Sequence, residues 1–258
     1  MIRLKIKMSI IILLLSFIHG QEMKADDIME RVQSIKKPTT SIINVRIDII
    51  RKKGNKEKTK IREFTRYEKH YESGRYTSKI LARFNKPKVI KGTGLLSWEN
   101  KDGQIDQWMF LPKLKTAKKI KAKQRSKSFL NTDFIYEDLE SRKPGLDSLV
   151  NIGIELIDGQ QCRVLMAWPK DDSYYFSRKI WVNTQNWQIN KVEYYKSQSE
   201  KEKTLIISSF IEQSGFITPG KMVMDMGNGN KTVMTITSFQ PEVGLNEEIF
   251  SKTFLIKI

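Results

Sequence analysis

Few side chains of this sequence are of the types that carry out covalent catalysis. His70 is the only histidine besides His19, which lies in a segment that we expect to be removed, so a Ser-His-Asp triad would depend on one imidazole. Cys162 is the only cysteine, and its apolar surroundings are typical of a small buried side chain rather than a nucleophile. No group of His, Cys and carboxylates has zinc spacing, and no Asp-rich loop has calcium spacing. The sequence therefore predicts a protein that is not an enzyme and that uses no metal or cofactor.

Methionines offer a means of binding an apolar ligand. Met222, Met224 and Met226 alternate along one predicted strand and so share a face, while Met234 lies in the next strand on a face that the register decides. Methionine is flexible and polarizable, so this row is suited to a cavity that accepts ligands of varied shape. Ordinary filling of a core is the alternative.

A dense run of cations occupies the middle of the chain, between an aromatic strand and Phe129. Its eight members are Lys113, Lys115, Lys118, Lys119, Lys121, Lys123, Arg125 and Lys127. One interpretation is a docking surface for a partner or a membrane, to which Lys118, Lys119 and Lys121 supply charge. The other is an edge strand that its lysines protect from aggregation.

The first twenty residues have the composition of a secretory signal peptide, with three cations followed by the apolar residues 8–18. That apolar stretch is too short to span a bilayer as a helix, which needs about twenty residues. We therefore expect cleavage after Gly20, with an uncleaved anchor as the alternative, and a periplasmic location. Cleavage lowers the formal net charge from +17 to 17 − 3 = +14.

The positive charge of an exported protein favours partners other than nucleic acid. Anionic lipid headgroups, contacted transiently, or an acidic protein surface fit better, at about 1 kcal/mol per cation close to a charged membrane. A solvated basic surface without a dedicated partner is the alternative.

Residues 21–258 are expected to form a single domain with one helix near its start. The helix signals are an Asp-x-x-Glu capping box at Asp27 and apolar residues at Ile28, Val32 and Ile35, which predict a helix over 27–37 that Pro38 ends.

From Ile43 onward the apolar period changes to two, which predicts about ten or eleven strands. Turn signals separate them, and the clearest is Asn228-Gly229. An antiparallel sheet that curls around itself as an incomplete barrel, with helices over its open side, fits this pattern best.

Four motifs lie between residues 84 and 139. They are Phe84-Asn85-Lys86-Pro87, Lys91-Gly92-Thr93-Gly94, Trp108-Met109-Phe110-Leu111-Pro112 and the run SFLNTDFIYEDL at 128–139. In this order they resemble the signature of the outer-membrane lipoprotein-sorting family, the LolA-like carriers of the bacterial periplasm. Asn131 stands where that family has glycine, and asparagine is the residue that best replaces glycine in left-handed geometry.

The resemblance implies an incomplete antiparallel β-barrel closed by helices around an apolar cavity. Such a protein binds the acyl chains of lipoproteins or another lipid and transfers them between the inner and outer membranes. It receives them from an inner-membrane transporter or export complex and delivers them to an outer-membrane acceptor. From position and residue type we predict that the cavity lining or lid consists of Trp108, Phe110, Phe129, Phe134, Met222 and Met224. The alternative function is a periplasmic sensor or adaptor of the same fold that binds the exported domain of a membrane protein.

Overall fold

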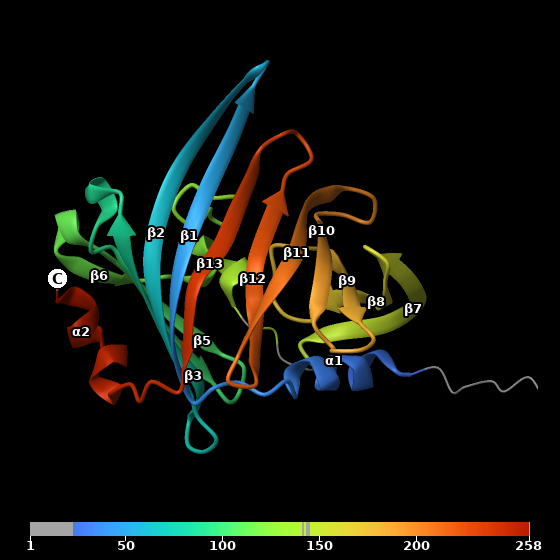
Figure 1. Ribbon diagram of the computed structural model, residues 1–258, viewed down its shortest axis with the longest axis horizontal. Helices are drawn as coiled ribbons and strands as arrows, with labels where there is room; N and C mark the ends of the chain where they lie inside the picture. Colours follow the sequence, from blue (N-terminus) through green and yellow to red (C-terminus); the bar gives the residue numbers. More distant parts are fainter. Residues whose placement is uncertain (1–22, 141, 143–144, 258) are drawn as a thin grey trace, which may run out of the picture.

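Thirteen strands form one antiparallel sheet that curls without closing (Figure 1). The computed structural model describes residues 23–140, 142 and 145–257, so the predicted signal peptide lies outside the described residues. The strands are β1 (Thr40–Lys53), β2 (Lys56–His70), β3 (Tyr76–Lys86), β4 (Gly94–Asn100), β5 (Ile105–Leu111), β6 (Thr116–Lys119), β7 (Asp147–Ile157), β8 (Gln160–Pro169), β9 (Ser177–Asn183), β10 (Ile189–Tyr195), β11 (Lys201–Gln213), β12 (Phe216–Asp225) and β13 (Lys231–Pro241). The predicted incomplete antiparallel barrel is confirmed.

The order of strands across the sheet is β6-β5-β4-β3-β2-β1-β13-β12-β11-β10-β9-β8-β7. Two meanders therefore meet where β1 pairs with β13, for example at Ile47 and Met234. Strands β6 and β7 follow each other in the chain but lie at opposite edges of the sheet. The segment that connects them must consequently cross from one edge to the other, and it contains the SFLNTDFIYEDL run.

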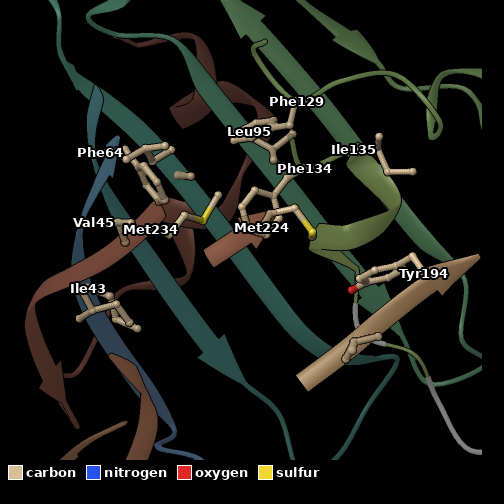
Figure 2. Packing of buried hydrophobic residues seen from close by; sticks show 14 of the residues in the cluster. Ile43, Val45, Phe64, Leu95, Phe129, Phe134, Ile135, Tyr194, Met224 and Met234 are labelled. Carbon is tan, nitrogen blue, oxygen red and sulfur yellow. The ribbon is translucent and has the colours of Figure 1, made fainter. Parts of the chain in front are cut away.

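Side chains alternate between the two faces of the sheet, as the period of two predicts. In β4, Leu95 belongs to the main hydrophobic core, whereas its neighbour Leu96 belongs to a second cluster. In β1 the predicted apolar row lies entirely in the main core, and no member is more than 5% exposed. This row is Ile43, Val45, Ile47 and Ile49. The main core thus fills the inner face of the curled sheet (Figure 2).

Two short helices lie on different sides of the sheet. Helix α1 (Ala25–Gln33) buries Ile28 completely in the main core. It begins and ends earlier than the predicted 27–37, and its N-cap is Lys24 without a side-chain hydrogen bond, so the predicted capping box at Asp27 is wrong. Helix α2 (Lys252–Ile256) contributes Leu255 to the second cluster on the outer face. Single 3₁₀ turns occur at η1 (Lys88–Ile90), η2 (Pro112–Leu114), η3 (Ala122–Gln124), η4 (Tyr136–Leu139) and η5 (Glu247–Phe250). No helix in the described part of the chain is both long and apolar enough to cross a bilayer.

Of the two edge strands, β6 lies within the cationic run for which an edge strand was one of the two interpretations, whereas β7 was not predicted. Strand β6 has only four residues, and two of them are the exposed lysines Lys118 and Lys119. Strand β7 has eleven residues, and its pairing with β8 shifts register between Asn151 and Gly153, where Gly153 has a φ of +126°. Its exposed aliphatic side chains are Val150, Ile152, Ile154 and Leu156.

Candidate functional site

The segment Ser128–Leu139, which we call the crossing loop, lies over the inner face of the sheet and is bound to it through its carboxylates. Asp133 forms an ion pair of 2.9 Å with Arg51 of β1, and it accepts a hydrogen bond of 2.6 Å from the hydroxyl of Thr232 on β13. Its backbone N–H donates to the same hydroxyl. The middle of the loop is thereby joined to the centre of the sheet.

Asp138 makes the most buried ion pair of the loop. Its Oδ2 lies 2.6 Å from Nζ of Lys203 on β11, and it also accepts from the backbone N–H of Ile135. The Tyr175 hydroxyl donates to the other carboxylate oxygen at 2.7 Å. Burial lowers the pKa of Lys203, and burial together with the Asp138 charge raises the pKa of Tyr175. Each polar atom of this carboxylate is therefore used to position the loop.

Glu137 joins the loop to β9 and to the residues before it. Its Oε1 lies 2.6 Å from Nη2 of Arg178, and its Oε2 accepts from the backbone N–H of Tyr174 at 2.9 Å. Just beyond the loop, Glu140 pairs with Arg125 at 2.5 Å. The acidic residues of the family motif thus have structural partners in several different strands.

The aromatic residues of the loop are packed into the main core. Phe129 and Phe134 are 2% and 3% exposed, and the Phe129 ring lies 6.0 Å from that of Phe84. Asn131 adopts a φ of 58°, the left-handed geometry expected of a residue that replaces glycine. The loop consequently fills much of the inner face instead of leaving it open.

A cavity of about 490 Å³ remains between α1, the inner face and the far side of the crossing loop; we call it the α1 cavity. Met29 and Val32 of α1, together with Ile35, form one apolar wall. The facing apolar wall comes from the sheet and consists of Ile43, Ile180, Ile189, Val192, Tyr194, Leu205, Ile207, Ile217 and Phe239. Charged side chains also line it, namely Lys37, Arg66, Glu68, His70, Glu137, Asp138, Glu140, Arg142, Asp147 and Arg178. The space suits a ligand with one apolar and one polar part.

The six predicted lining residues fall into two groups, and none lines the α1 cavity. Phe129, Phe134 and Met224 are buried in the main core (Figure 2). Met222 is partly buried and packs against this core. Met222 pairs directly with Met234, so the two methionines lie on adjacent strands of the inner face.

Trp108 and Phe110 lie in the second cluster on the outer face, with Phe250 and Leu255, whereas Met109 between them faces the main core. The structure therefore separates these two aromatic residues from the other four. Their predicted contact with a ligand stays a prediction, but it would concern a different face of the sheet.

The apolar pattern of the sequence marks some residues of the α1 cavity as facing the interior. Val32 and Ile35 belong to the predicted apolar face of the helix, and Ile43 begins the predicted alternating row. Arg178 and Leu205 carry no comparable signal, because only the curl of the sheet brings β9 and β11 opposite α1.

The three predicted docking lysines lie at or beside the β6 edge. Lys119 Nζ is 2.5 Å from Oδ1 of Asp106 and 5.8 Å from the centre of the Trp108 ring. Lys118 and Lys121 are exposed. These positions agree with an edge protected by charge, and the docking role stays a prediction.

Cys162 and His70, the two residues considered for catalysis, have contacts that are common in a folded core or ion pair. Cys162 is fully buried beside Val164 and Trp181, and burial raises the pKa of its thiol. His70 Nε2 lies 3.1 Å from Oε1 of Glu68. Among the described residues, no three His, Cys, Asp or Glu side chains are grouped so that they could hold a metal ion.

An open antiparallel sheet, curled around a core and covered by a helix on each side, defines the class of incomplete β-barrels. A family model described as "-like: Uncharacterized protein" matches residues 76–257. The chain belongs to this family, and its resemblance to the outer-membrane lipoprotein-sorting, LolA-like proteins is confirmed.

Three solved structures are similar over nearly the whole fold. A domain from Vibrio parahaemolyticus described as outer-membrane lipoprotein-sorting has 25% identity and a TM-score of 0.82, with 90% of this chain and 98% of that one covered. A DUF1329 family protein from Desulfovibrio piger has 24% identity and a TM-score of 0.81, with 90% and 97% covered. A LolA superfamily protein from Nitrosomonas europaea has 22% identity and a TM-score of 0.68, with 90% and 99% covered. A search of curated proteins finds no match.

Proposed function

We propose that this protein is a periplasmic carrier that binds the acyl chains of lipoproteins or of another lipid and transfers them between the two membranes. The observation that carries the proposal is the α1 cavity. It has a volume of about 490 Å³ and lies between helix α1 and an apolar face of the sheet. Ligand pockets commonly measure about 300–1,000 Å³. The similarity to a lipoprotein-sorting domain supports the same assignment.

Shielding of an acyl chain is a sufficient physical reason for such a carrier. Each methylene exposed to water costs about 0.8 kcal/mol, so a chain of ten methylenes costs roughly 8 kcal/mol. A cavity that covers the chain removes much of this cost during passage through water. The proposal requires binding and release, and it includes no covalent step.

Release is compatible with the way α1 covers the cavity. The helix has nine residues, and only Ala25 and Ile28 are buried. A helix this short has little stability of its own, because isolated helices need about 12–15 residues to be even marginally stable. Its displacement from the sheet would expose the cavity without unfolding the strands.

The proposed location and domain organisation rest on the sequence. We propose that residues 1–20 are a cleaved signal peptide and that 21–258 form a single domain. Fractionation of cells and amino-terminal sequencing of the mature protein test both points. A mature protein that begins at residue 1 would contradict cleavage.

Lipid analysis tests the proposed function most directly. Mass spectrometry of organic extracts from the purified protein should reveal bound lipid, and the protein should bind a fluorescent fatty-acid probe. Val32→Trp and Leu205→Trp, which fill the α1 cavity, should each weaken probe binding by about tenfold. The control is Val89→Trp at a position that is 67% exposed and outside the cavity.

The outcome of this experiment also separates the alternatives. Absence of both bound lipid and probe binding would overturn the carrier and favour the sensor or adaptor. Met222→Ala and Met224→Ala test the methionine row separately. Unchanged probe binding in these variants would assign the methionines to the core alone.

The proposed partners are an inner-membrane transporter or export complex, an outer-membrane acceptor and transiently an anionic membrane. Lys118, Lys119 and Lys121 are the proposed docking charges. Their triple substitution by glutamine should weaken sedimentation with vesicles that contain phosphatidylglycerol. Equal sedimentation of the variant and the native protein would remove these lysines from the proposal.

A further inference from the structure

The carboxylates that face the α1 cavity are all paired with cations. Glu68 pairs with Arg66 at 2.9 Å and with His70 at 3.1 Å. The other pairs are Glu137 with Arg178, Asp138 with Lys203, Glu140 with Arg125 and Asp147 with Arg142. No unpaired carboxylate of the described cavity wall is therefore available for a cationic ligand.

Arg178 has a guanidinium nitrogen that lacks a hydrogen-bond partner. Its side chain is 7% exposed, and Nη2 donates to Glu137 at 2.6 Å and to the Ser173 hydroxyl at 3.2 Å. Nη1 is buried and has no hydrogen-bond acceptor among the described residues. Its nearest recorded carboxylate oxygen, Oδ1 of Asp147, lies 3.6 Å away and already accepts from Arg142 at 2.7 Å. A buried donor without an acceptor costs about 1–3 kcal/mol, so this atom is prepared for an oxygen that the described residues do not supply.

Arg66 presents a similar donor from the opposite wall. Its Nη2 pairs with Glu68, while its Nε is buried without a partner in the described structure. Arg66 and Arg178 are the cavity-lining residues that have such orphan atoms, and in both the atom is a donor. Lys37 also lines the cavity, is exposed, and forms no ion pair with any described residue. The polar part of the cavity consequently has buried hydrogen-bond donors that lack an acceptor among the described residues.

Apolar side chains adjoin these donors in the same cavity. Val192, Leu205 and Phe239 line it together with Arg178 and Arg66. A ligand that satisfies both parts has a hydrocarbon chain and an acceptor-rich head. A carboxylate or a phosphate fits the guanidinium best, since charge-assisted hydrogen bonds are roughly twice as strong as neutral ones.

We infer that the α1 cavity selects anionic amphiphiles, with the head bound by Arg178 Nη1 and Arg66 Nε and the chain held against the apolar wall. This inference rests on the proposed lipid-carrier function and narrows its ligand class. It discriminates against lipids with an uncharged head and against cationic amphiphiles. The oxyanion is either the carboxylate of a free fatty acid or the phosphate of a phospholipid, and these two sources are separated experimentally.

Matched ligands test the inference by their ability to displace the fluorescent probe. Dodecanoate, dodecyl phosphate, dodecanol and dodecyltrimethylammonium share a twelve-carbon chain and differ in the head. We expect the two anions to bind at least tenfold more tightly than the alcohol, and the cation to bind most weakly. Tighter binding of dodecanoate would identify a fatty-acid carboxylate as the head, and tighter binding of dodecyl phosphate would identify a phospholipid phosphate.

Two variants test the named residues. Because Arg178→Met alone would leave Glu137 as an unpaired buried charge, Arg178→Met is combined with Glu137→Gln. Arg66→Gln tests the opposite wall. Both variants should reduce the preference for anions to about twofold or less while retaining affinity for dodecanol. The control is Arg163→Met, which removes an arginine that also has an unpartnered buried Nε but lies outside the cavity.

The salt dependence of anion binding distinguishes the contribution of the buried arginines from that of the exposed Lys37. The contribution of Lys37 should be screened at 0.5 M NaCl, whereas that of the buried Arg178 should persist. Equal binding of dodecanoate and dodecanol would overturn the inference and leave the carrier function intact. Anion preference that is unchanged in both variants would overturn the assignment to Arg178 and Arg66. Failure of all four ligands to bind would overturn the carrier function itself.

Discussion

Lys203 Nζ and Asp138 Oδ2 lie 2.6 Å apart, and both side chains are only 1% exposed. The pair joins β11 to the crossing loop across 65 residues of sequence. Lys203 also donates to the backbone carbonyl of Asp133 at 2.9 Å. One lysine therefore determines the position of both ends of the acidic part of the loop.

Lys203→Met should destabilise the protein by about 3–5 kcal/mol, because it leaves the Asp138 charge buried without its cationic partner. Urea unfolding at pH 7, followed by tryptophan fluorescence, measures the loss. Lys201→Met is the control, since its side chain is 49% exposed and its pair with Glu193 is long at 3.3 Å. In the double variant Lys203→Met/Asp138→Asn the loss should be smaller than the sum of the single losses. A loss below about 0.5 kcal/mol in Lys203→Met would refute a stabilising role.

Gly94→Ala should cost about 1–3 kcal/mol through overpacking on the outer face. A Cβ at this position would lie 2.7 Å from Cδ1 of Leu255 and 3.1 Å from Nη1 of Arg83. Arg83 cannot move freely, because it donates to the carbonyls of Gly92, Phe254 and Leu255. Thermal unfolding provides the measurement, and strict additivity of Gly94→Ala with Leu255→Ala would show that the two sites are independent.

Acid should destabilise the folded protein partly through Glu68. Burial acts to raise the pKa of this carboxyl, but the charges of Arg66, His70 and Lys37 and the His70 hydrogen bond lower it to about 2 from 4.5. Because the folded pKa lies below the unfolded one, the stabilisation is complete above about pH 4.5 and is lost as the pH falls to about 2. Its size is roughly 3 kcal/mol.

The matching variant is Glu68→Gln. Its unfolding free energy should lie below that of the native protein at pH 6, and the difference should diminish between pH 4.5 and 2. Chemical denaturation at several pH values measures both curves. A constant difference over this range would contradict the assignment to Glu68.

Cys162 should react with a thiol reagent only when the protein unfolds. The side chain is fully buried, and burial raises the pKa of its thiol, so the native protein contains little accessible thiolate. Labelling with Ellman's reagent at pH 8 should be slow in buffer and complete in urea. Rapid labelling of the native protein would show that β8 and β9 separate readily.

The β7 edge should promote self-association at high concentration, since it has exposed aliphatic residues and no lysine or proline. Ile154→Lys should lower the fraction of associated protein in sedimentation-velocity experiments. Ser148→Lys is the control, because it adds the same charge without removing an exposed aliphatic side chain. Equal effects of the two variants would indicate that only net charge matters.

Local residue patterns predicted much of the fold. The alternation that begins at Ile43 predicted β1 and its buried face, and the spacing of Ile28, Val32 and Ile35 predicted the helix that covers the sheet. These features need only neighbouring residues, because the apolar period reports which face of an element is buried. Strand β7 escaped prediction because it exposes its aliphatic residues and shifts register between Asn151 and Gly153, whereas β6 lies in the cationic run for which an edge strand was one of the two interpretations.

The sequence by itself determined the antiparallel architecture, the family resemblance and the importance of the crossing loop. Only the tertiary structure decided that Met109 faces the core while Trp108 and Phe110 face outward, because a shift of one residue reverses every side chain of a strand. It also decided that the cavity lies beneath α1 and that Asp133, Glu137 and Asp138 pair with Arg51, Arg178 and Lys203. These partners are distant in sequence, and they meet because β6 and β7 occupy opposite edges of a curled sheet and the chain between them must cross its inner face.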